Sequence, residues 1–209
     1  MGPTSASTRT RSAGSGAREI RRQETRARLF DAALTEIGRY GLAGADVSAI
    51  AAAAGVVRGT FYFHFPTKEH VLVELERNEE ARIVAELADK LTDTEDLASL
   101  LTTLVRAVAD AERRLGPVVF RDMLGLHFSQ TRPGEDELSD HPLAGFVVVA
   151  ITNAQKAGHV TPEQDAGELA VFFLTGLFAL LATGAHDSAA VGAVLARYVT
   201  TIVKGMETR

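Results

Sequence analysis

The stretch Asp46–Lys68, DVSAIAAAAGVVRGTFYFHFPTK, decides how the first part of this chain folds. Asp46 is of a residue type that caps the start of a helix, and the apolar Ile50 and Ala54 then recur at helical spacing. Gly55 follows at a position where a helix has to end and the backbone has to turn sharply. A second helix begins directly after this turn, so the stretch is typical of a helix-turn-helix.

The second helix of this stretch has two different sides. Val57, Phe61 and Phe65 recur at every fourth position and form the side that is predicted to be buried. The opposite side has no core to cover it, and it presents Arg58, Gly59, Tyr62 and Phe63. An arginine fits a bidentate contact with guanine, a glycine lets the backbone approach a groove closely, and a phenylalanine can meet the methyl group of thymine. This side is therefore predicted to read the edges of DNA bases.

The charge of the chain is divided unevenly along its length. Residues 1–70 hold ten Arg or Lys and six Asp or Glu, a net charge of +4, whereas the whole chain of 209 residues carries −5. Residues 71–209 therefore carry −9. A basic N-terminal region attracts phosphates by releasing their counterions, and an acidic remainder stays away from the polyanion. The asymmetry indicates one oriented contact with DNA.

Composition excludes several classes of protein. The absence of cysteine excludes disulfides and thiolate metal sites. The six histidines lack the paired i, i+4 spacing of metal ligands, so neither a metal nor another cofactor is expected. No sequence motif of a hydrolase, phosphate loop or metalloprotease occurs, so the chain is not expected to be an enzyme. Residues 1–20 lack the apolar centre of a secretion signal and are expected to form a flexible basic tail.

Helical periodicity runs through the rest of the chain, and alternating strand patterns are missing. One helix is predicted at residues 24–40 and ends at Gly41, and a long helix follows the capping residue Thr67. Further helices are predicted at 96–114, 117–130, 142–157, 162–184 and 188–206. The fourth of these five is predicted to start at a capping box, Thr161-Pro162-Glu163-Gln164. The fold class is therefore all-α, with a three-helix DNA-binding head at 21–66 and a helical body at 67–209.

The segment IAAAAGVVRGTFYFHFPTKEHVL, residues 50–72, resembles the helix-turn-helix signature of the tetracycline-repressor (TetR) family. The resemblance implies an all-helical, homodimeric transcriptional regulator. Carried over by position, it also implies that Arg58, Gly59 and Phe63 face base edges. The residues that it places on DNA phosphates are Thr60, Tyr62, His64 and Lys68.

Two predicted helices of the body offer faces for a small molecule. The apolar faces of 117–130 and 142–157 are expected to enclose a pocket for a mainly apolar effector. The residues predicted to line it are Phe120, Met123, Leu124, His127, Phe146, Val149 and Asn153. The same side chains would serve equally well as ordinary core, and a histidine on such a face needs a polar partner in either case.

The run LAVFFLTGLFALLATGA, residues 169–185, is the most hydrophobic part of the chain. It is shorter than the stretch of about 20 apolar residues that a membrane span needs, so no membrane is expected. Because a helix that is apolar on all sides has to be covered on all sides, a homodimer through the last two helices is expected. The residues predicted at this dimer interface are Phe172, Gly176, Phe178 and Val199.

These features together predict a ligand-responsive, dimeric DNA-binding regulator, a repressor that grips a palindromic operator and is released by a small-molecule effector. It would work in the cytoplasm, at the nucleoid. Two recognition helices about 34–36 Å apart would enter successive major grooves, and an effector that favours a more splayed dimer would lower operator affinity. The alternatives are an architectural DNA-binding protein without an effector and a helical enzyme. The sequence identifies neither the effector nor the operator.

Overall fold

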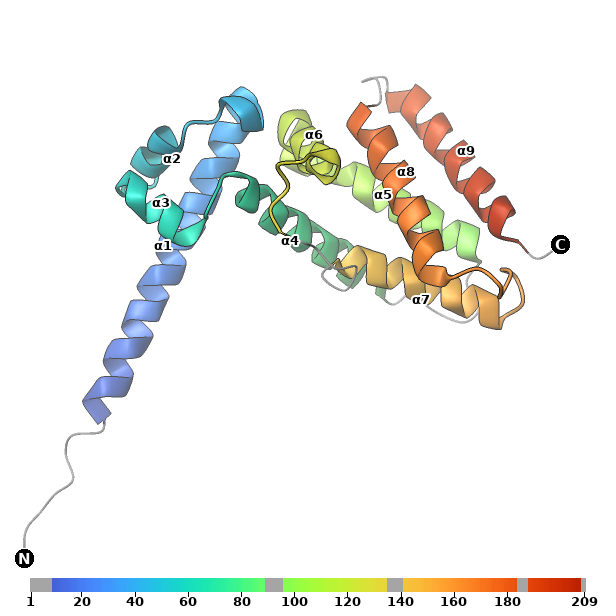
Figure 1. Cartoon of the computed structure of the whole chain (residues 1–209), viewed down its shortest axis with the longest axis horizontal. Coiled ribbons are helices and arrows are strands. Elements are labelled where there is room, and N and C mark those ends of the chain that lie inside the picture. Colours follow the sequence, from blue (N-terminus) through green and yellow to red (C-terminus); the bar gives the residue numbers. More distant parts are fainter. Residues whose placement is uncertain (1–8, 89–95, 135–140, 184–187, 208–209) are drawn as a thin grey trace, which may run out of the picture. The chain divides into compact units, whose positions relative to one another are not determined.

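The structure of the chain, a computed structural model, describes residues 9–88, 96–134, 141–183 and 188–207 (Figure 1). Within these ranges the chain is helical, apart from turns and one isolated antiparallel bridge between Val160 and Glu207. The predicted all-α class is confirmed. The chain divides into two compact units, Met1–Val71 and Leu72–Arg209, which are called the head and the body below.

The head is built from three helices: α1 (Arg9–Gly44), α2 (Val47–Ala53) and α3 (Arg58–His64). The first helix breaks at Gly41, whose φ of 72° lies in the left-handed region, as the sequence predicted. The expected tail at 1–20 differs from the structure, because α1 is helical from Arg9 onward; residues 1–8 lie outside the described part of the chain. A side-chain ion pair one turn apart, Arg22 to Glu19 at 2.7 Å, favours this early start.

The core of the head joins all three helices. It consists of apolar side chains that are almost completely buried: Leu29, Ala33, Ile50, Ala54, Phe61, Phe65 and Val71. The aromatic rings pack against one another, with 5.8 Å between the ring centroids of Phe61 and Phe65. This core fixes α3 by its inner side and leaves its outer side free.

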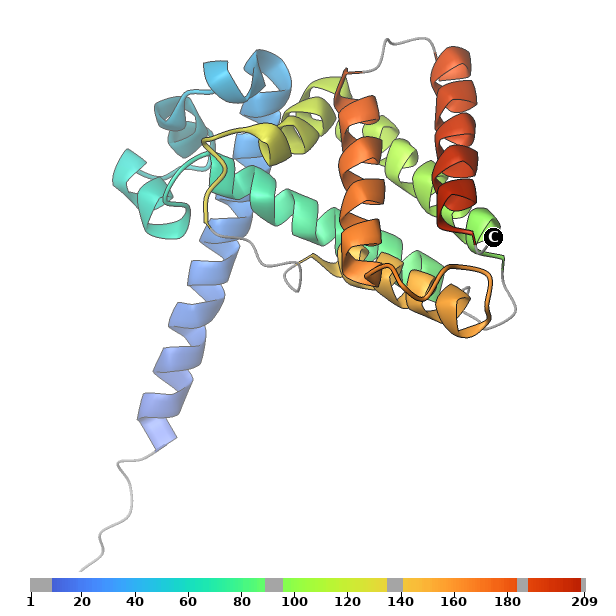
Figure 2. The same cartoon turned by 45° about the vertical axis from the view of Figure 1, so that its right-hand side comes forward.

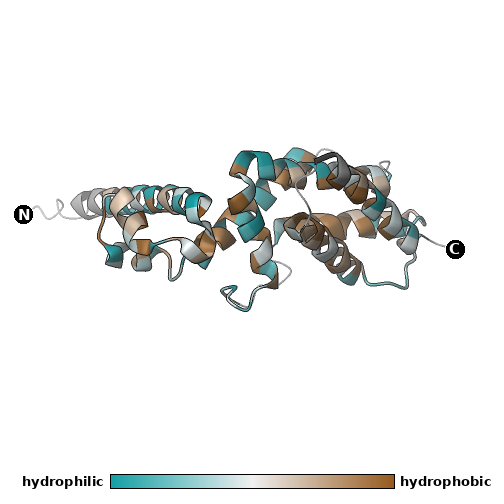
Figure 3. Cartoon of the chain, turned by 90° about the horizontal axis from the view of Figure 1, so that it is seen from above, coloured by the Kyte–Doolittle hydropathy of each residue, from teal (hydrophilic) through white to brown (hydrophobic). Residues whose placement is uncertain are grey.

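The body begins within α4 (Glu69–Leu87), because the division between the two units falls between Val71 and Leu72. The elements that follow are α5 (Leu97–Leu115), α6 (Pro117–Gly125), the 3₁₀ turn η2 (Leu126–Phe128), α7 (Pro142–Lys156), α8 (Ala166–Thr183) and α9 (Ser188–Met206). Figure 2 shows α8 and α9 running antiparallel side by side, and α8 also packs on α6 and α7. Figure 3 shows many hydrophobic residues along the helices of the body.

The start of α8 corrects the sequence prediction. The helix begins at Ala166 rather than at Pro162, and the Asp165 carboxylate accepts a 2.9 Å hydrogen bond from the backbone N–H of Glu168. Thr161 instead donates its hydroxyl to Glu163. Aspartate caps a helix as well as threonine does, so two caps competed within a few residues and the later one starts the helix.

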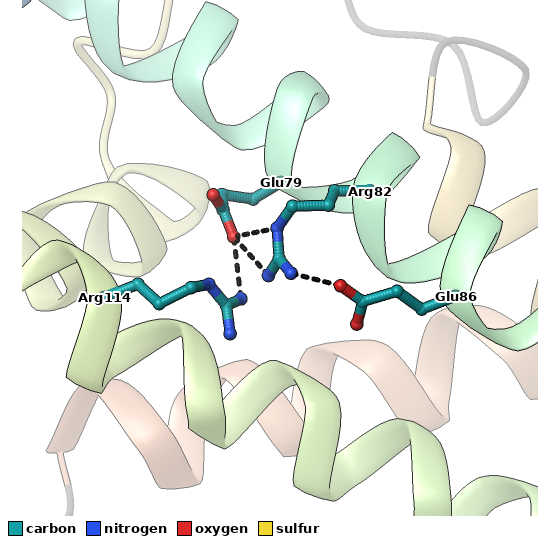
Figure 4. A network of polar contacts seen from close by, with 4 residues as sticks. All are labelled: Glu79, Arg82, Glu86 and Arg114. Atoms are coloured by element: carbon teal, nitrogen blue, oxygen red, sulfur yellow. Dashed lines mark hydrogen bonds and ion pairs between the residues drawn. The ribbon is translucent and has the colours of Figure 1, made fainter.

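A surface network joins α4 to α5 (Figure 4). The Glu79 carboxylate forms ion pairs with Arg82 of its own helix and with Arg114 of the last turn of α5, each at 2.9 Å. Arg82 also forms an ion pair with Glu86. Ion pairs near solvent contribute little free energy each, so this network orients the two helices while apolar burial holds them together.

Candidate nucleic-acid interface and body cavities

The turn between α2 and α3 is fixed by local hydrogen bonds. The Asp46 carboxylate caps α2 by accepting from the backbone N–H of Ser48 at 2.8 Å. Gly55 then takes a φ of 69°, and the N–H of Val56 donates to the carbonyl of Ala51 at 2.9 Å. A residue with a side chain is strained at such a φ, so the glycine is what allows α3 to start immediately after α2.

The outer side of α3 is an exposed surface with large side chains. Phe63 is 72% exposed and Tyr62 is 43% exposed, whereas Phe61 and Phe65 are buried on the opposite side. Val57 was predicted to join the buried side, but it is 74% exposed. It is the N-cap residue of α3 with an extended backbone, so helical spacing does not apply to it.

Arg58 and Tyr62 hold each other on this outer side. The Arg58 guanidinium donates a 3.1 Å hydrogen bond to the Tyr62 hydroxyl, one turn later. The same guanidinium lies 5.7 Å from the centre of the Tyr62 ring. Thr60, which the resemblance places on a phosphate, lies between these two residues in the sequence, and its side chain is half-buried. These two contacts therefore restrict the position of the Arg58 side chain.

Gly59 lies next to Arg58 with open space above it. A Cβ atom placed on Gly59 would meet no heavy atom of the described chain within 4 Å, and the residue does not need a positive φ. Glycine in a helix costs about 1 kcal/mol relative to alanine. Since nothing inside the described chain requires a glycine here, the position suits the close approach of another molecule.

His64, at the end of α3, lies near arginines of α1. Its buried Nδ1 atom has no hydrogen-bond partner among the described residues, and burial together with the charges of Arg22 and Arg26 lowers the pKa of His64. Arg26 also lies over the Phe65 ring, 4.4 Å from its centre. The sequence analysis missed these arginines, although Arg18, Arg22 and Arg26 recur at every fourth residue and so share one side of a helix.

Lys68 has a structural role that the sequence did not reveal. Its Nζ donates to the carbonyl oxygens of Ala43 at 3.0 Å and Ala45 at 3.3 Å. These carbonyls belong to the end of α1 and the start of the link to α2, where backbone acceptors lack helical partners. The lysine therefore ties the start of α4 to the helix-turn-helix, and its phosphate contact stays a prediction.

Besides a pocket of about 290 Å³ between α8 and α9, which Phe172 lines, the described part of the body contains two smaller cavities. One of about 140 Å³ is lined by Glu80, His127, His141, Ala144, Val171, Leu174, Thr175 and Phe178. A second of about 20 Å³ lies among Phe120, Met123 and Leu124, with Glu76, Glu80 and Phe178 among its other lining residues. Four of the residues predicted for the pocket, the three apolar ones of α6 and His127, thus border a cavity.

The other three predicted pocket residues, all on α7, line neither of these cavities. Phe146 is buried in the core, Asn153 is half-buried, and Val149 is 48% exposed. The inner side of α7 is formed by residues such as Val147, Ile151 and Ala154, so Val149 points away from it. The expectation for Val149 is therefore wrong.

Buried polar groups from α4 line both of these small cavities. Glu76 is 2% exposed; its carboxylate contacts His127 Nε2 and accepts a 2.9 Å hydrogen bond from Arg132. Burial alone would raise the pKa of Glu76, but the hydrogen bond from His127 and the charge of Arg132 keep this pKa below its usual value. Glu80, 5% exposed, lies 3.2 Å from His141 Nδ1, and this hydrogen bond raises the pKa of His141.

The residues predicted for the dimer interface fall into two groups. Phe172 is 64% exposed, but Phe178 and Val199 are buried within the single chain at 6% and 2% exposure. At Gly176, a Cβ atom would lie 2.9 Å from two ring carbons of Tyr198, so its close approach joins α8 to α9 of the same chain. The prediction was wrong for these three residues, because they meet their own chain: Val199 is buried in it, α9 approaches α8 at Gly176, and Phe178 packs on His127 with 4.7 Å between the ring centroids.

The remaining side of α8 has no cover within the described chain. Val171 is 42% exposed beside Phe172, and Val194 of α9 is 46% exposed. By length and composition α8 passes the test for a membrane span, as apolar core helices also do, and 39% of it is buried in the body. Exposed apolar area of this kind marks a surface that another molecule covers.

Comparison with known proteins connects these features to a family. Residues 29–75 match the family model of bacterial regulatory proteins, tetR family. The HTH-type transcriptional regulator EthR of Mycobacterium tuberculosis is 37% identical over 98 residues, which are 45% of this chain and 39% of EthR. AcrR of Shigella flexneri is 38% identical over 61 residues, 29% of this chain and 28% of AcrR. The matched segments thus span less than half of either relative.

Solved structures share the fold over nearly the whole chain. The TetR-family repressor FadR of Thermus thermophilus, in complex with lauroyl-CoA, has a TM-score of 0.70 and 21% identity, covering 88% of this chain and 96% of that one. FadR of Bacillus halodurans has a TM-score of 0.61 and 20% identity, covering 87% of this chain and 99% of that one. Residues 29–75 therefore match the tetR family of bacterial regulatory proteins, and nearly the whole chain shares its fold with these solved structures.

Proposed function

We propose that this protein is a dimeric transcriptional regulator that represses a promoter until a small molecule releases it from DNA. The observation that carries the proposal is the outer side of α3, where Arg58 and Tyr62 are held together beside the open surface of Gly59. A bidentate arginine beside a glycine is suited to guanine in the major groove. The relatives EthR and AcrR are named as HTH-type transcriptional regulators.

The proposed contact set divides into two kinds of residue. Arg58, Gly59 and Phe63 would read base edges, and Thr60, Tyr62, His64 and Lys68 would meet phosphates. The α1 residues Arg22 and Arg26, which lie close enough to His64 to lower its pKa, would add phosphate contacts beside them. Phosphate contacts act on every sequence alike, whereas base contacts discriminate.

The test is a comparison of Arg58→Ala and Arg22→Ala on DNA fragments that the wild-type protein selects from a random library. The Arg58 variant should lose about 1–3 kcal/mol at one preferred base pair and keep its affinity for other sequences. The Arg22 variant should bind all sequences more weakly and show a salt dependence that is shallower by about one unit. An equal loss on every sequence for Arg58→Ala would exclude a base contact by Arg58.

The proposal includes a homodimer through the uncovered side of α8. Phe172 and Val171 of α8 and Val194 of α9 would supply its apolar centre. A two-fold dimer presents two heads to two half-sites of a palindrome. Sedimentation at micromolar concentration should give a dimer for the wild type and a shift to monomer for Phe172→Glu; a wild-type monomer would overturn the two-headed mechanism.

The effector is proposed to enter the 140 Å³ cavity beside Phe178 and His127. Pockets for drug-sized ligands have volumes of about 300–1,000 Å³, so the effector is either small or widens the cavity as it binds. Widening would move α4, which carries Glu80 of the cavity wall and follows the head in the chain. The architectural alternative, with no effector, is favoured by the small volume; a screen in which no small molecule both raises the Tm and releases DNA would support it.

The regulator is proposed to have no catalytic activity and to act in the cytoplasm, on nucleoid DNA. Its named relatives are regulators, and the 140 Å³ cavity that borders the polar cluster of the body leaves little space for a substrate.

A further inference from the structure

The polar cluster of the body has an arrangement that the regulator function does not require. Glu76 and Glu80 lie one turn apart on α4, so their carboxylates share one side of the helix, and His127 comes from η2. One ligand atom from each of these three residues lies within 4.8 Å of the other two. We propose that Glu76, Glu80 and His127 bind a divalent transition-metal ion, a site that the sequence spacing of the histidines had argued against.

The burial of the two carboxylates supports a bound cation. Both are almost completely buried, at 2% and 5% exposure. A buried carboxylate is costly unless a positive charge compensates it. Arg132 supplies one such charge to Glu76, at 2.9 Å from Oε2. A divalent ion between Glu76, Glu80 and His127 would compensate both carboxylates and leave the contact of Arg132 in place.

The groups around the three ligands hold them in position. The backbone N–H of Leu143 donates to Glu80 Oε2 at 3.2 Å, and His141 Nδ1 lies 3.2 Å from Glu80 Oε1. Metal-binding side chains in proteins are oriented by hydrogen bonds of this kind. Each Glu80 oxygen thus has one hydrogen-bond partner, and its second lone pair can still bind an ion.

The ligand types select the class of metal. An imidazole together with two carboxylates suits Zn²⁺, Fe²⁺ or Mn²⁺, while Mg²⁺ and Ca²⁺ prefer oxygen ligands alone. The 140 Å³ cavity, which Glu80 and His127 also line, gives the ion a path of entry. Three protein ligands would leave a fourth position of a tetrahedral ion open for water or a small molecule.

The test uses the full-length chain without a histidine tag, stripped with a chelator and titrated with ZnCl₂ or, for comparison, MgCl₂. Calorimetry should show one Zn²⁺ per chain. At a free Zn²⁺ concentration of about 100 Kd the melting temperature should rise by roughly 5–10 °C, and EDTA should reverse the rise. The same concentration of MgCl₂ should leave the melting temperature unchanged.

Matched variants locate the ion. Glu80→Gln and His127→Gln should lose the stoichiometric binding, whereas Glu86→Gln, a half-exposed carboxylate of the same helix, and His159→Gln, an exposed histidine, should keep it. Absence of binding to the wild type would overturn the proposal and leave an ion-pair cluster. If both Glu80→Gln and His127→Gln still bound the ion, the ion would lie elsewhere and the proposal would be overturned as well.

If Glu80→Gln and His127→Gln do not fold, ¹⁵N-histidine spectra of the wild-type protein decide whether His127 binds the ion. Zinc should shift the imidazole nitrogens of His127, and a shift confined to other histidines would overturn the proposal. Each readout reports metal binding rather than DNA release, so failure of the regulator function and failure of the metal site remain distinguishable.

Discussion

Replacing Gly59 with alanine should make the protein more stable and make it bind DNA less well. A methyl group at Gly59 would meet no heavy atom of the described chain within 4 Å, and the backbone needs no positive φ there. The exchange therefore removes only the entropic penalty of glycine in a helix, worth about 0.5–1 kcal/mol. For a chain of this size that corresponds to a rise in Tm of roughly 1–4 °C.

The effect on DNA binding has the opposite sign. If α3 lies in the major groove with Gly59 against the bases, the added methyl group overpacks that contact. Overpacking costs typically about 1–3 kcal/mol, which weakens binding by about 5- to 150-fold. Fluorescence anisotropy on a selected DNA fragment measures the loss, and a thermal melt of the same preparation measures the gain.

Gly145→Ala on α7 is the matched control, because Gly145 is also helical, exposed and free of neighbours within 4 Å. It should raise the Tm similarly and leave DNA affinity unchanged. A Gly59→Ala variant that is stabilised yet binds every fragment as the wild type does would refute the assignment of this side of α3 to DNA. A destabilised variant would refute the open surroundings of Gly59.

Three further predictions follow from contacts in the structure. Lys68→Met should lower stability by about 1–3 kcal/mol in urea unfolding, because it leaves the carbonyls of Ala43 and Ala45 without their donor; unchanged stability would contradict those bonds. Burial and nearby arginines lower the pKa of His64 in the folded protein, so the unfolded chain takes up the proton at a higher pH and the free energy of unfolding should fall as the pH drops through about 6.5. His64→Gln should make this dependence of stability on pH shallower, and an unchanged dependence would contradict the lowered pKa. Gly176→Ala should destabilise the body despite the better helix propensity of alanine, because its methyl group overlaps Tyr198, and Tyr198→Leu should relieve part of the loss; additive effects in a double-mutant cycle would contradict the contact.

Tyr198 is a residue whose role could not be read from the sequence. Its hydroxyl donates a 2.6 Å hydrogen bond to the carbonyl oxygen of Phe173, and burial raises the pKa of Tyr198 to about 12, so the phenol remains a donor at any physiological pH. The sequence predicted Gly176 at a dimer interface, whereas Gly176 lies against Tyr198 of its own chain. Helix periodicity defines an apolar side without naming its partner.

The sequence by itself determined the local elements of this protein. Gly55 has to lie in a turn because of its backbone conformation, Phe61 and Phe65 have to be buried because they share a helical side, and the breaks at Gly41 and Gly116 follow from their positive φ. These are interactions between residues a few positions apart, so the order and type of the helices could be predicted. Where two local signals competed, as before α8, the boundary was missed.

Only the tertiary structure decided which distant groups meet. The buried cluster joins Glu76 and Glu80 of α4 to His127 and His141, which lie about fifty and sixty residues later in the chain. No spacing rule connects such positions, because a ligand set assembled from separate helices depends on how the apolar sides of those helices pack. The same reason explains Val149, Phe178 and Val199: their hydrophobic character was evident, but the packing of α7, α8 and α9 decided which of them face the core and which face solvent.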